Sequence, residues 1–175
     1  EPLVPRSLRK EVDERFLADS SELKEVSPNQ VKEILLKLKK ENVASVAVCF
    51  LFSYLNHSHE EIVEKCIKEV WPDVYYSISS TIIPEFREFE RLSTTVINSY
   101  LGPKMKQYID NLHQRVSSMG IDVEPYITQS NGGVMSISST VETPVQTALS
   151  GPSAGVVGAI YVAESAGFNN LITYD

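Results

Sequence analysis

The 175-residue sequence has few cysteines, no excess of positive charge and no long apolar run. Cys49 and Cys66, its two cysteines, each lie inside an apolar segment, which favours buried free thiols in a reducing compartment over a disulfide. A net charge of −7 argues against nucleic-acid binding, because such surfaces carry a basic patch. No stretch approaches the roughly 18 apolar residues of a transmembrane helix. These absences favour a cytoplasmic protein that binds neither nucleic acid nor membrane.

Several motifs of catalysis and metal binding are also missing. The sequence contains no H-x-x-x-H or C-x-x-C pattern, so a protein metal site is not expected. It has no G-x-S-x-G elbow of a serine hydrolase and no Gly-Lys-Ser/Thr of a P-loop. Its apolar content of 42% is nevertheless sufficient for a core without disulfides or metals.

The first half of the chain alternates helical and strand patterns. After an irregular polar stretch over residues 1–26, the pattern predicts a helix that begins at Pro28, a buried strand over 43–52, a helix from Ser58 to Trp71 and a strand over 74–79. Ser27 with Gln30, and Ser58 with Glu61, have the spacing of capping boxes. This order predicts an α/β fold in which helices flank a layered, mainly parallel sheet.

The second half begins with a long helical pattern that opens at Pro84 and ends at Gly120. Gly102-Pro103 is expected to kink or split that helix. A strand over 123–128 and a turn follow, and then a helix from Ser150 that is apolar nearly all round and rich in small residues, which predicts close packing. The last residues, 171–175, read as one more strand.

Acids and bases alternate with phenylalanines at the start of the long helix, in the order Pro84-Glu85-Phe86-Arg87-Glu88-Phe89-Glu90-Arg91. Acids in a first turn complement the helix dipole. Glu88 with Arg91, and Arg87 with Glu90, are spaced for ion pairs within the helix. Spacing alone therefore favours a structural role, and a catalytic role is the alternative.

Two glycine-containing clusters follow. Gln129-Ser130-Asn131-Gly132-Gly133 has the Asn-Gly pair of a hairpin turn, and its exposed amides could also cradle an anion. Ser150-Gly151-Pro152-Ser153-Ala154-Gly155 opens a helix whose free N–H groups suit a phosphate or carboxylate, although small residues for close packing explain it equally well. Both interpretations of each cluster stay open.

Taken together and in this order, the clusters resemble the hydantoinase A/5-oxoprolinase family. The resemblance covers essentially the whole chain, and its most specific part is the succession of Glu85–Arg91, Ser93-Thr94-Thr95, Asn98–Leu101, Gln129–Gly133 and Ser150–Gly155. The Asn131 form is more similar to the hydantoinase and acetone-carboxylase branches than to eukaryotic oxoprolinases.

The resemblance implies an actin-like (ribonuclease H-like) ATPase core that uses ATP and Mg²⁺ to activate a cyclic amide or a ketone. In the hydrolases, phosphorylation of the amide oxygen would make the ring carbonyl susceptible to water. The family binds phosphate with two Asp-x-Gly-Gly-Thr loops, of which this sequence holds only Asp175, where the second would begin. We therefore expect the chain by itself to be inactive, with a second subunit of the hydantoinase B type as a further partner.

By this resemblance, residues 1–149 form the latter part of the first actin-like lobe, and residues 150–175 form a linking helix and the first strand of the second. It implies catalytic roles for Glu85, Arg87, Glu88 and Arg91, and nucleotide binding by Asn131, Gly132, Gly133, Ser150, Gly151 and Asp175. The leading hypothesis is an ATP-dependent cyclic-amide hydrolase. The alternatives are an ATP-dependent acetone or acetophenone carboxylase subunit and a non-catalytic binding module of the same fold.

Overall fold

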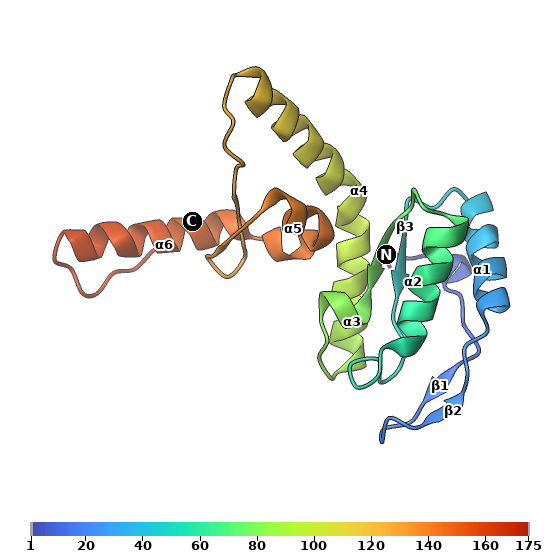
Figure 1. The fold of residues 1–175 in the computed structure, drawn as a ribbon. Coiled ribbons are helices and arrows are strands. Elements are labelled where there is room, and N and C mark those ends of the chain that lie inside the picture. Colours follow the sequence, from blue (N-terminus) through green and yellow to red (C-terminus); the bar gives the residue numbers. More distant parts are fainter. Residues whose placement is uncertain (1, 175) are drawn as a thin grey trace. The chain divides into compact units, whose positions relative to one another are not determined.

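A computed structural model describes residues 2–174 of the chain (Figure 1). Its strands form three separate two-stranded sheets, of which one is parallel and two are antiparallel. The chain divides into two compact units, one that ends at Pro103 and one that begins at Lys104. The fold is thus mixed α/β, as expected, but its sheets are small and only one of them is parallel.

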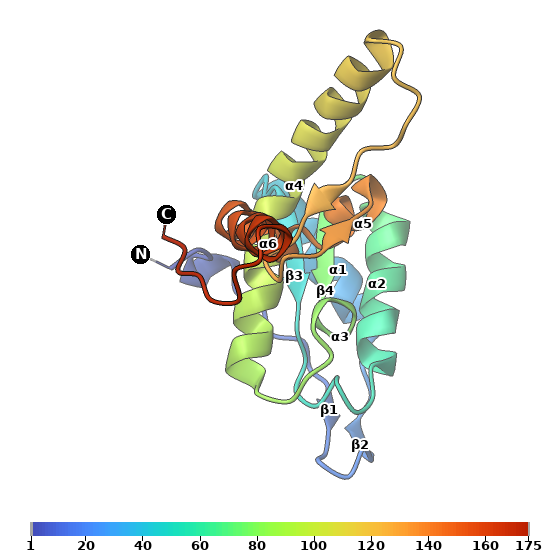
Figure 2. The same cartoon turned by 90° about the vertical axis from the view of Figure 1, so that its left-hand side faces the viewer.

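The first unit is built around strands β3 (Ser45–Val48) and β4 (Tyr75–Ile78), which pair in parallel from Ser45 opposite Tyr75 to Val48 opposite Ile78. Helices α1 (Pro28–Lys40) and α2 (Ser58–Val70) cover one face of this pair, as both views show (Figures 1 and 2). Their buried side chains meet those of the strands in one core, made of Val26, Val31, Leu35, Val46, Val48, Val63, Cys66, Ile67, Val74 and Ile78.

The other face of the strand pair lies against the first half of α4 (Glu88–Ser118), and this contact is polar (Figure 2). Asn98 Nδ2 donates to Ser77 Oγ at 3.0 Å, and Ser99 Oγ donates to the carbonyl of Val46 at 2.9 Å. The backbone of Gly102 lies so close to the Tyr75 ring that a Cβ there would be 2.0 Å from it. The parallel pair therefore has one apolar face and one face of satisfied buried polar groups.

A hairpin of β1 (Arg15–Phe16) and β2 (Glu22–Lys24) follows a short 3-10 helix, η1 (Arg6–Leu8), in the stretch expected to be irregular. His59 at the start of α2 holds this hairpin. Its buried ring lies 2.7 Å from Glu14 Oε2 and 3.0 Å from Glu22 Oε1, and it stacks on Phe16 with 4.0 Å between the ring centroids. The polar sequence did not predict this hairpin because Phe16 is the one buried apolar residue of its two strands and the other contacts are charged.

Three local predictions in this unit need correction. Neither Ser27 nor Ser58 caps its helix with its side chain, and Gln30 instead accepts a hydrogen bond from the backbone N–H of Asp13 at 3.0 Å. The long helix begins at Glu88 rather than at Pro84, because Arg87 has a φ of +77°, which a right-handed helix cannot include. A one-turn helix, α3 (Ser79–Ile82), lies ahead of it.

The second unit contains the rest of α4, which runs through Pro103 without being split. Strands β5 (Ile127–Thr128) and β6 (Val134–Met135) form an antiparallel hairpin whose turn contains Gly132 at a φ of +83°, as the Asn-Gly pair predicted. Two short helices that no sequence pattern predicted follow, α5 (Ile137–Glu142) and the 3-10 helix η2 (Pro144–Thr147).

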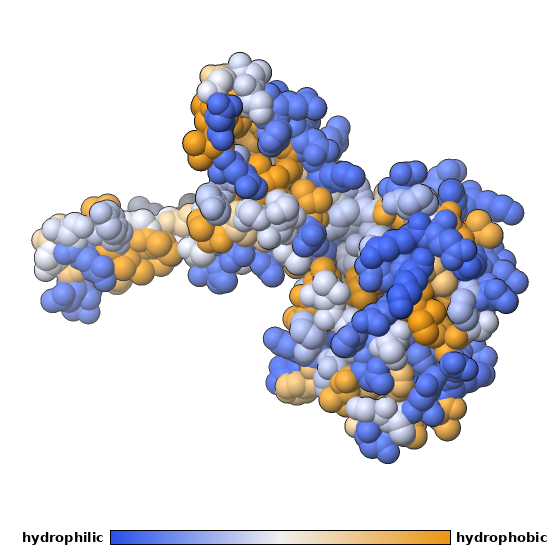
Figure 3. All heavy atoms as spheres, viewed as in Figure 1, coloured by the Kyte–Doolittle hydropathy of each residue, from blue (hydrophilic) through white to orange (hydrophobic). Residues whose placement is uncertain are grey.

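The last helix, α6 (Ser150–Ser165), is apolar as predicted, but none of its residues is buried. Hydrophobic residues, orange in Figure 3, are visible over this helix. Its exposed apolar side chains include Val156, Val157, Ile160, Tyr161 and Val162. Val157 lies close to Gly132 of the β5–β6 turn, but the helix buries none of its residues, and residues 171–174 form no strand. No helix in the described part of the chain combines the length and hydropathy needed to cross a membrane.

Candidate functional site

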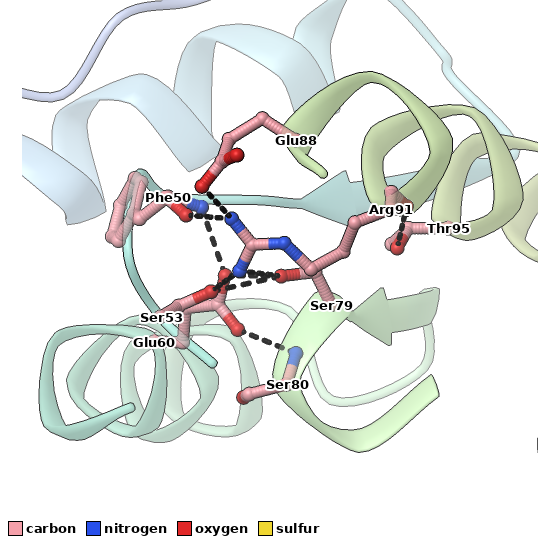
Figure 4. Close-up of polar contacts among 8 residues, drawn as sticks. All are labelled: Phe50, Ser53, Glu60, Ser79, Ser80, Glu88, Arg91 and Thr95. Carbon is pink, nitrogen blue, oxygen red and sulfur yellow. Dashed lines mark hydrogen bonds and ion pairs between the residues drawn. The ribbon is translucent and has the colours of Figure 1, made fainter. Parts of the chain in front are cut away.

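The polar cluster predicted to be catalytic lies at the carboxyl ends of the two parallel strands. β3 leads into the turn that contains Phe50 and Ser53, and β4 leads into Ser79 and Ser80 at the start of α3. Arg91 reaches this edge from the first turn of α4, and Glu60 reaches it from the first turn of α2 (Figure 4). Ligand sites of open α/β sheets lie outside this edge of the strands.

Arg91 is the centre of the cluster and is 1% exposed. Its guanidinium donates to Ser53 Oγ, to the carbonyl of Phe50 at 2.8 Å and to Glu88 Oε1 at 3.3 Å (Figure 4). Its Nε is a buried donor without a partner among the described residues. The predicted Glu88–Arg91 pair is thus confirmed, and it binds the helix start to the turn after β3.

Glu60 lies below Arg91 and is fully buried. Its carboxylate accepts hydrogen bonds from the backbone N–H of Phe50 at 2.8 Å, from the N–H of Ser80 at 2.9 Å and from Ser79 Oγ at 2.7 Å (Figure 4). A buried carboxylate needs such donors, because an unpaired buried charge is strongly unfavourable. Glu60 therefore joins the loops that follow β3 and β4.

Glu60, Ser53 and Ser79 are members of this cluster that the sequence patterns did not predict. The capping-box pattern drew attention to Glu61, the neighbour of Glu60, and Glu61 lies half exposed beside His57. The available signal was an acid in the first turn of the helix that follows a buried strand. The two serines carry no such signal, because serine is common in turns for other reasons.

The other predicted catalytic residues lie at the surface. Glu85 and Arg87 are exposed, and the Arg87 guanidinium lies over the ring of Phe86, 5.4 Å from its centroid. Within residues 2–174 Arg87 makes no ion pair with Glu90. The structure thus pairs the partly exposed Glu88 with the buried Arg91 and leaves Glu85 and Arg87 accessible.

Cys49 follows β3 and has Arg91 and Ser79 as neighbours. Burial raises the pKa of the Cys49 thiol, and Ser79 and Arg91 only partly offset this effect. A thiol with a raised pKa is a poor nucleophile. Both cysteines are free, as predicted, and the cluster offers no cysteine chemistry.

The predicted nucleotide-binding residues of the second unit form a separate polar cluster. Ser130 connects the β5–β6 turn to the chain around α6: its N–H donates to the carbonyl of Gln146 at 2.7 Å, and its own carbonyl accepts from Ser153 Oγ. Asn131 Oδ1 accepts from the N–H of Gly133 at 2.8 Å. The structure thus brings the turn and the start of α6 together.

An anion at this second cluster would need backbone N–H groups that are not already bonded. The N–H groups of Gln129, Ser130, Gly132 and Gly133 donate within the unit. Those of Asn131, Ser150 and Gly151 have no acceptor within residues 2–174, and Asn131 and Gly151 are exposed. These N–H groups are therefore the ones in the cluster that remain open to an acceptor. Asp175, also predicted here, lies outside the described residues.

Backbone strain separates the two clusters from the rest of the chain. Positive φ at Ser20, Asn42, Gly120, Gly132 and Gly167 is explained by a hairpin turn or a helix end. The other positive values belong to Phe52 (+60°) and Arg87 (+77°) in the first cluster, and to Leu149 (+58°), which directly precedes α6, in the second. A positive φ is unfavourable for residues other than glycine, and such strain concentrates at functional sites.

Comparison with known proteins matches this chain to one family. The family model for the hydantoinase/oxoprolinase N-terminal region matches residues 1–71, and the hydantoinase/oxoprolinase model matches residues 91–175. An uncharacterized protein of Methanocaldococcus jannaschii is 34% identical over 99% of this chain and 26% of its own length. The caprolactamase subunit alpha of Pseudomonas jessenii is 32% identical over 99% of this chain and 25% of its own length.

The acetophenone carboxylase gamma subunit of Aromatoleum aromaticum is 26% identical over 99% of this chain and 24% of its own length. Among solved structures, the ATP-dependent caprolactamase of Pseudomonas jessenii superimposes with a TM-score of 0.89 at 31% identity, over 97% of this chain and 24% of that one. Nucleotide-free acetone carboxylase shares the fold, with a TM-score of 0.80 at 23% identity over 97% of this chain and 24% of that one. The chain thus spans about a quarter of the length of these relatives.

Proposed function

This chain belongs to the hydantoinase/oxoprolinase family, and we propose that it is part of an ATP-dependent enzyme that hydrolyses the ring amide of a cyclic substrate. The observation that carries the proposal is the likeness, over nearly the whole chain, to an ATP-dependent caprolactamase in both sequence and fold. Because the chain spans only about a quarter of that relative, the remaining catalytic groups would come from further polypeptide and from a partner subunit of the hydantoinase B type.

The chemistry requires activation, because a ring amide is a poor electrophile. ATP would supply a phosphoryl group to the amide oxygen, after which water adds to the ring carbon, the C–N bond breaks and the nitrogen takes a proton. A second water molecule releases phosphate and leaves the open-chain amino acid. The protein's contribution is to hold the reacting groups in place and to bind the negative charge on the transferred group.

In the first unit, Arg87 is the residue suited to binding that charge. It is exposed, it is permanently cationic, and a guanidinium binds phosphate or carboxylate oxygens through two parallel N–H groups. Glu85 lies on the same short segment and is accessible to substrate as an acceptor. Arg91 would act from the interior, and Glu88, which is partly exposed, is paired with it.

In the second unit, Asn131 and the start of α6 would hold phosphate of the nucleotide. Gly132 and Gly133 would let the backbone come close to it, since neither adds a side chain to the turn. Mg²⁺ would accompany the nucleotide. We further propose that the fold is an actin-like lobe, with residues 1–149 in the first lobe and residues 150–175 leading into the second, where Asp175 would begin a phosphate loop.

A ketone carboxylase is a second candidate function. It is supported by the whole-chain likeness to the gamma subunit of an acetophenone carboxylase. In such an enzyme ATP would activate a ketone and bicarbonate rather than an amide. The lower identity of that relative, 26% against 32% for the caprolactamase subunit, places it second.

The test is an assay of the complete enzyme, which combines this chain with its further polypeptide and partner subunit. Caprolactam, 5-oxoproline and hydantoin are supplied with Mg-ATP, and both ADP and the ring-opened product are measured. We expect ring opening that stops without ATP and yields ADP and product in equal amounts. Product formation without ATP would overturn the proposal, as would ADP formation only with a ketone and bicarbonate, the outcome that the second candidate predicts.

A further inference from the structure

The strained residues of the first cluster have a specific relation to Arg91. Phe52, with a φ of +60°, directly precedes Ser53, and Arg87, with a φ of +77°, directly precedes Glu88. Ser53 and Glu88 are two of the groups to which the Arg91 guanidinium donates. Each strained residue is therefore the neighbour of a residue that Arg91 holds.

The backbone adds a further link between Arg91 and Arg87. The N–H of Arg91 donates to the carbonyl of Arg87 at 3.0 Å, as the first hydrogen bond of α4. Arg91 thus fixes the segment before the helix twice, through this bond and through the Glu88 side chain. Strained backbone persists only where its surroundings hold it, and the buried guanidinium provides such surroundings for Arg87.

Glu60 strengthens the set of contacts that Arg91 makes with Phe50, Ser53 and Glu88, which we call the Arg91 anchor. Phe50 donates its N–H to Glu60 and accepts from Arg91 with its carbonyl, so the same residue is held by both buried charges (Figure 4). If either buried charge lost these hydrogen bonds, it would remain in the interior without partners, which is unfavourable. The turn after β3 and the start of α4 are therefore joined at a fixed separation.

The Arg91 anchor holds the backbone of Arg87 while leaving its side chain at the surface. Its side chain is exposed and lies over the Phe86 ring, and no carboxylate among residues 2–174 forms an ion pair with it. A glycine or asparagine would occupy a left-handed position at lower cost, so an arginine at this position is unfavourable for folding alone. The unfavourable backbone is better explained by a use for the side chain.

We propose that Arg91 is a positioning residue for Arg87, and that Arg87 binds the negative charge of the phosphorylated amide. This inference rests on the proposed function, which supplies the anionic group. Arg91 itself does not touch the substrate; it holds the Arg87 backbone in the left-handed conformation from which the side chain reaches the reacting group. Glu60 and Ser53 support Arg91 in the same role.

The test is a double-mutant cycle in the complete enzyme, with Arg87→Ala, Arg91→Lys and the two combined. We expect each single substitution to lower kcat/KM by about tenfold or more, the loss expected for one charge-assisted hydrogen bond. In the combined variant the loss should equal that of Arg87→Ala alone, because Arg91 acts through Arg87. Arg91→Lys should lower the thermal midpoint by the same amount in the wild-type enzyme and in the Arg87→Ala variant.

Losses of activity that multiply in the combined variant would overturn the proposal, since Arg91 would then act independently of Arg87. An unchanged kcat/KM in Arg91→Lys with a lowered thermal midpoint would also overturn it, because the role of Arg91 would be purely structural. If Arg91→Lys does not fold, Ser53→Ala replaces it, because that variant removes one partner of Arg91 without removing the buried charge.

A measurement that does not depend on enzyme activity distinguishes failure of the positioning claim from failure of the proposed function. NMR coupling constants report the backbone φ of Arg87 in the 175-residue chain, with and without Arg91→Lys. The positioning claim predicts that φ leaves the left-handed region in the variant. If φ stays there, the claim is wrong even when amide hydrolysis is confirmed. If φ changes but the wild-type enzyme opens no cyclic amide, the positioning role stands and the proposed substrate is wrong.

Discussion

The two units of this chain contain similar apolar segments but cover them very differently. In the unit that ends at Pro103, ten buried side chains of two helices, two parallel strands and the loops beside them form one core. In the unit that begins at Lys104, the most apolar helix, α6, has no buried residue. An apolar pattern therefore predicts that a helix needs to be covered, but not that its own unit covers it.

The difference has a consequence for stability. The folding free energy of the first unit comes from apolar side chains buried within that unit. In α6 no residue is buried, so burial among residues 2–174 contributes little to the stability of this helix. A helix that is apolar all round is ordinarily enclosed by protein. The relatives from Methanocaldococcus jannaschii and Pseudomonas jessenii are about four times as long as this chain.

The largest effect should come from the same substitution made in each unit. Ile67→Ala removes a side chain with 0% exposure, and we expect it to lower the free energy of unfolding by about 2–5 kcal/mol. Ile160→Ala changes a side chain that is 40% exposed, and its effect should stay below about 0.5 kcal/mol. Urea unfolding of the 175-residue chain measures the first, and hydrogen exchange of the α6 amides measures the second. Equal losses would show that α6 has a core of its own.

Two glycines sharpen the comparison through helix packing. In Gly102→Ala the new Cβ would overlap the Tyr75 ring, and overpacking of this kind costs about 1–3 kcal/mol. Gly155→Ala meets nothing within 4 Å, so the better helix propensity of alanine should stabilise α6 by up to about 1 kcal/mol. Circular dichroism during thermal unfolding distinguishes them. A destabilising Gly155→Ala would show that Gly155 has a close neighbour, which contradicts the open space around it in the structure.

A substitution at Gly132 tests the β5–β6 turn, which hydrogen bonds within the second unit hold in place. Its φ of +83° is unfavourable for other residues, and a Cβ would lie 2.8 Å from Val157 Cγ2. We expect Gly132→Val to destabilise the β5–β6 turn by about 1–3 kcal/mol. Faster exchange of the Gln129 amide, which donates to the carbonyl of Gly133, reports this loss. Unchanged exchange in Gly132→Val would contradict it.

The smallest effect concerns pH in the first unit. The hydrogen bond from Lys68, and then that from Tyr76, lower the pKa of the Glu64 carboxyl below its ordinary 4.5. A lowered folded-state pKa contributes stability above the ordinary value that is lost as pH falls through the folded one. Glu64→Gln should therefore cost about 0.2–1 kcal/mol at neutral pH and almost nothing in acid. A pH-independent difference between the unfolding free energies would contradict this assignment.

The sequence predicted the elements with a strong apolar period. Helices α1 and α2 were foreseen because burial on one face leaves a readable repeat. The strand expected over 43–52 was foreseen from its almost wholly apolar run, and the structure shortens it to Ser45–Val48. The β1–β2 hairpin was not, since charged residues around His59 hold it. The α4 boundary was misplaced because nothing in the residue type of Arg87 announces a positive φ.

The candidate site was foreseen in part. The spacing of Glu88 and Arg91 predicted their ion pair, but spacing within one helix cannot show that Arg91 turns inward to residues that precede it by about forty positions. Glu60, on another helix, was missed for the same reason. The assignments of Asn131, Gly132, Gly133, Ser150 and Gly151 to nucleotide and of Glu85 and Arg87 to catalysis stay predictions.

The central claim is that backbone strain at Arg87 is kept for the use of its side chain, and a matched pair of variants tests it most directly. Arg87→Gly and Ser20→Gly both replace a left-handed residue, at φ +77° and +66°, but Ser20 lies at the tip of the β1–β2 hairpin. The thermal midpoint and kcat/KM of the complete enzyme are measured for both. We predict that neither variant loses stability, and that only Arg87→Gly lowers kcat/KM, by about tenfold or more. Full activity of Arg87→Gly would contradict the account.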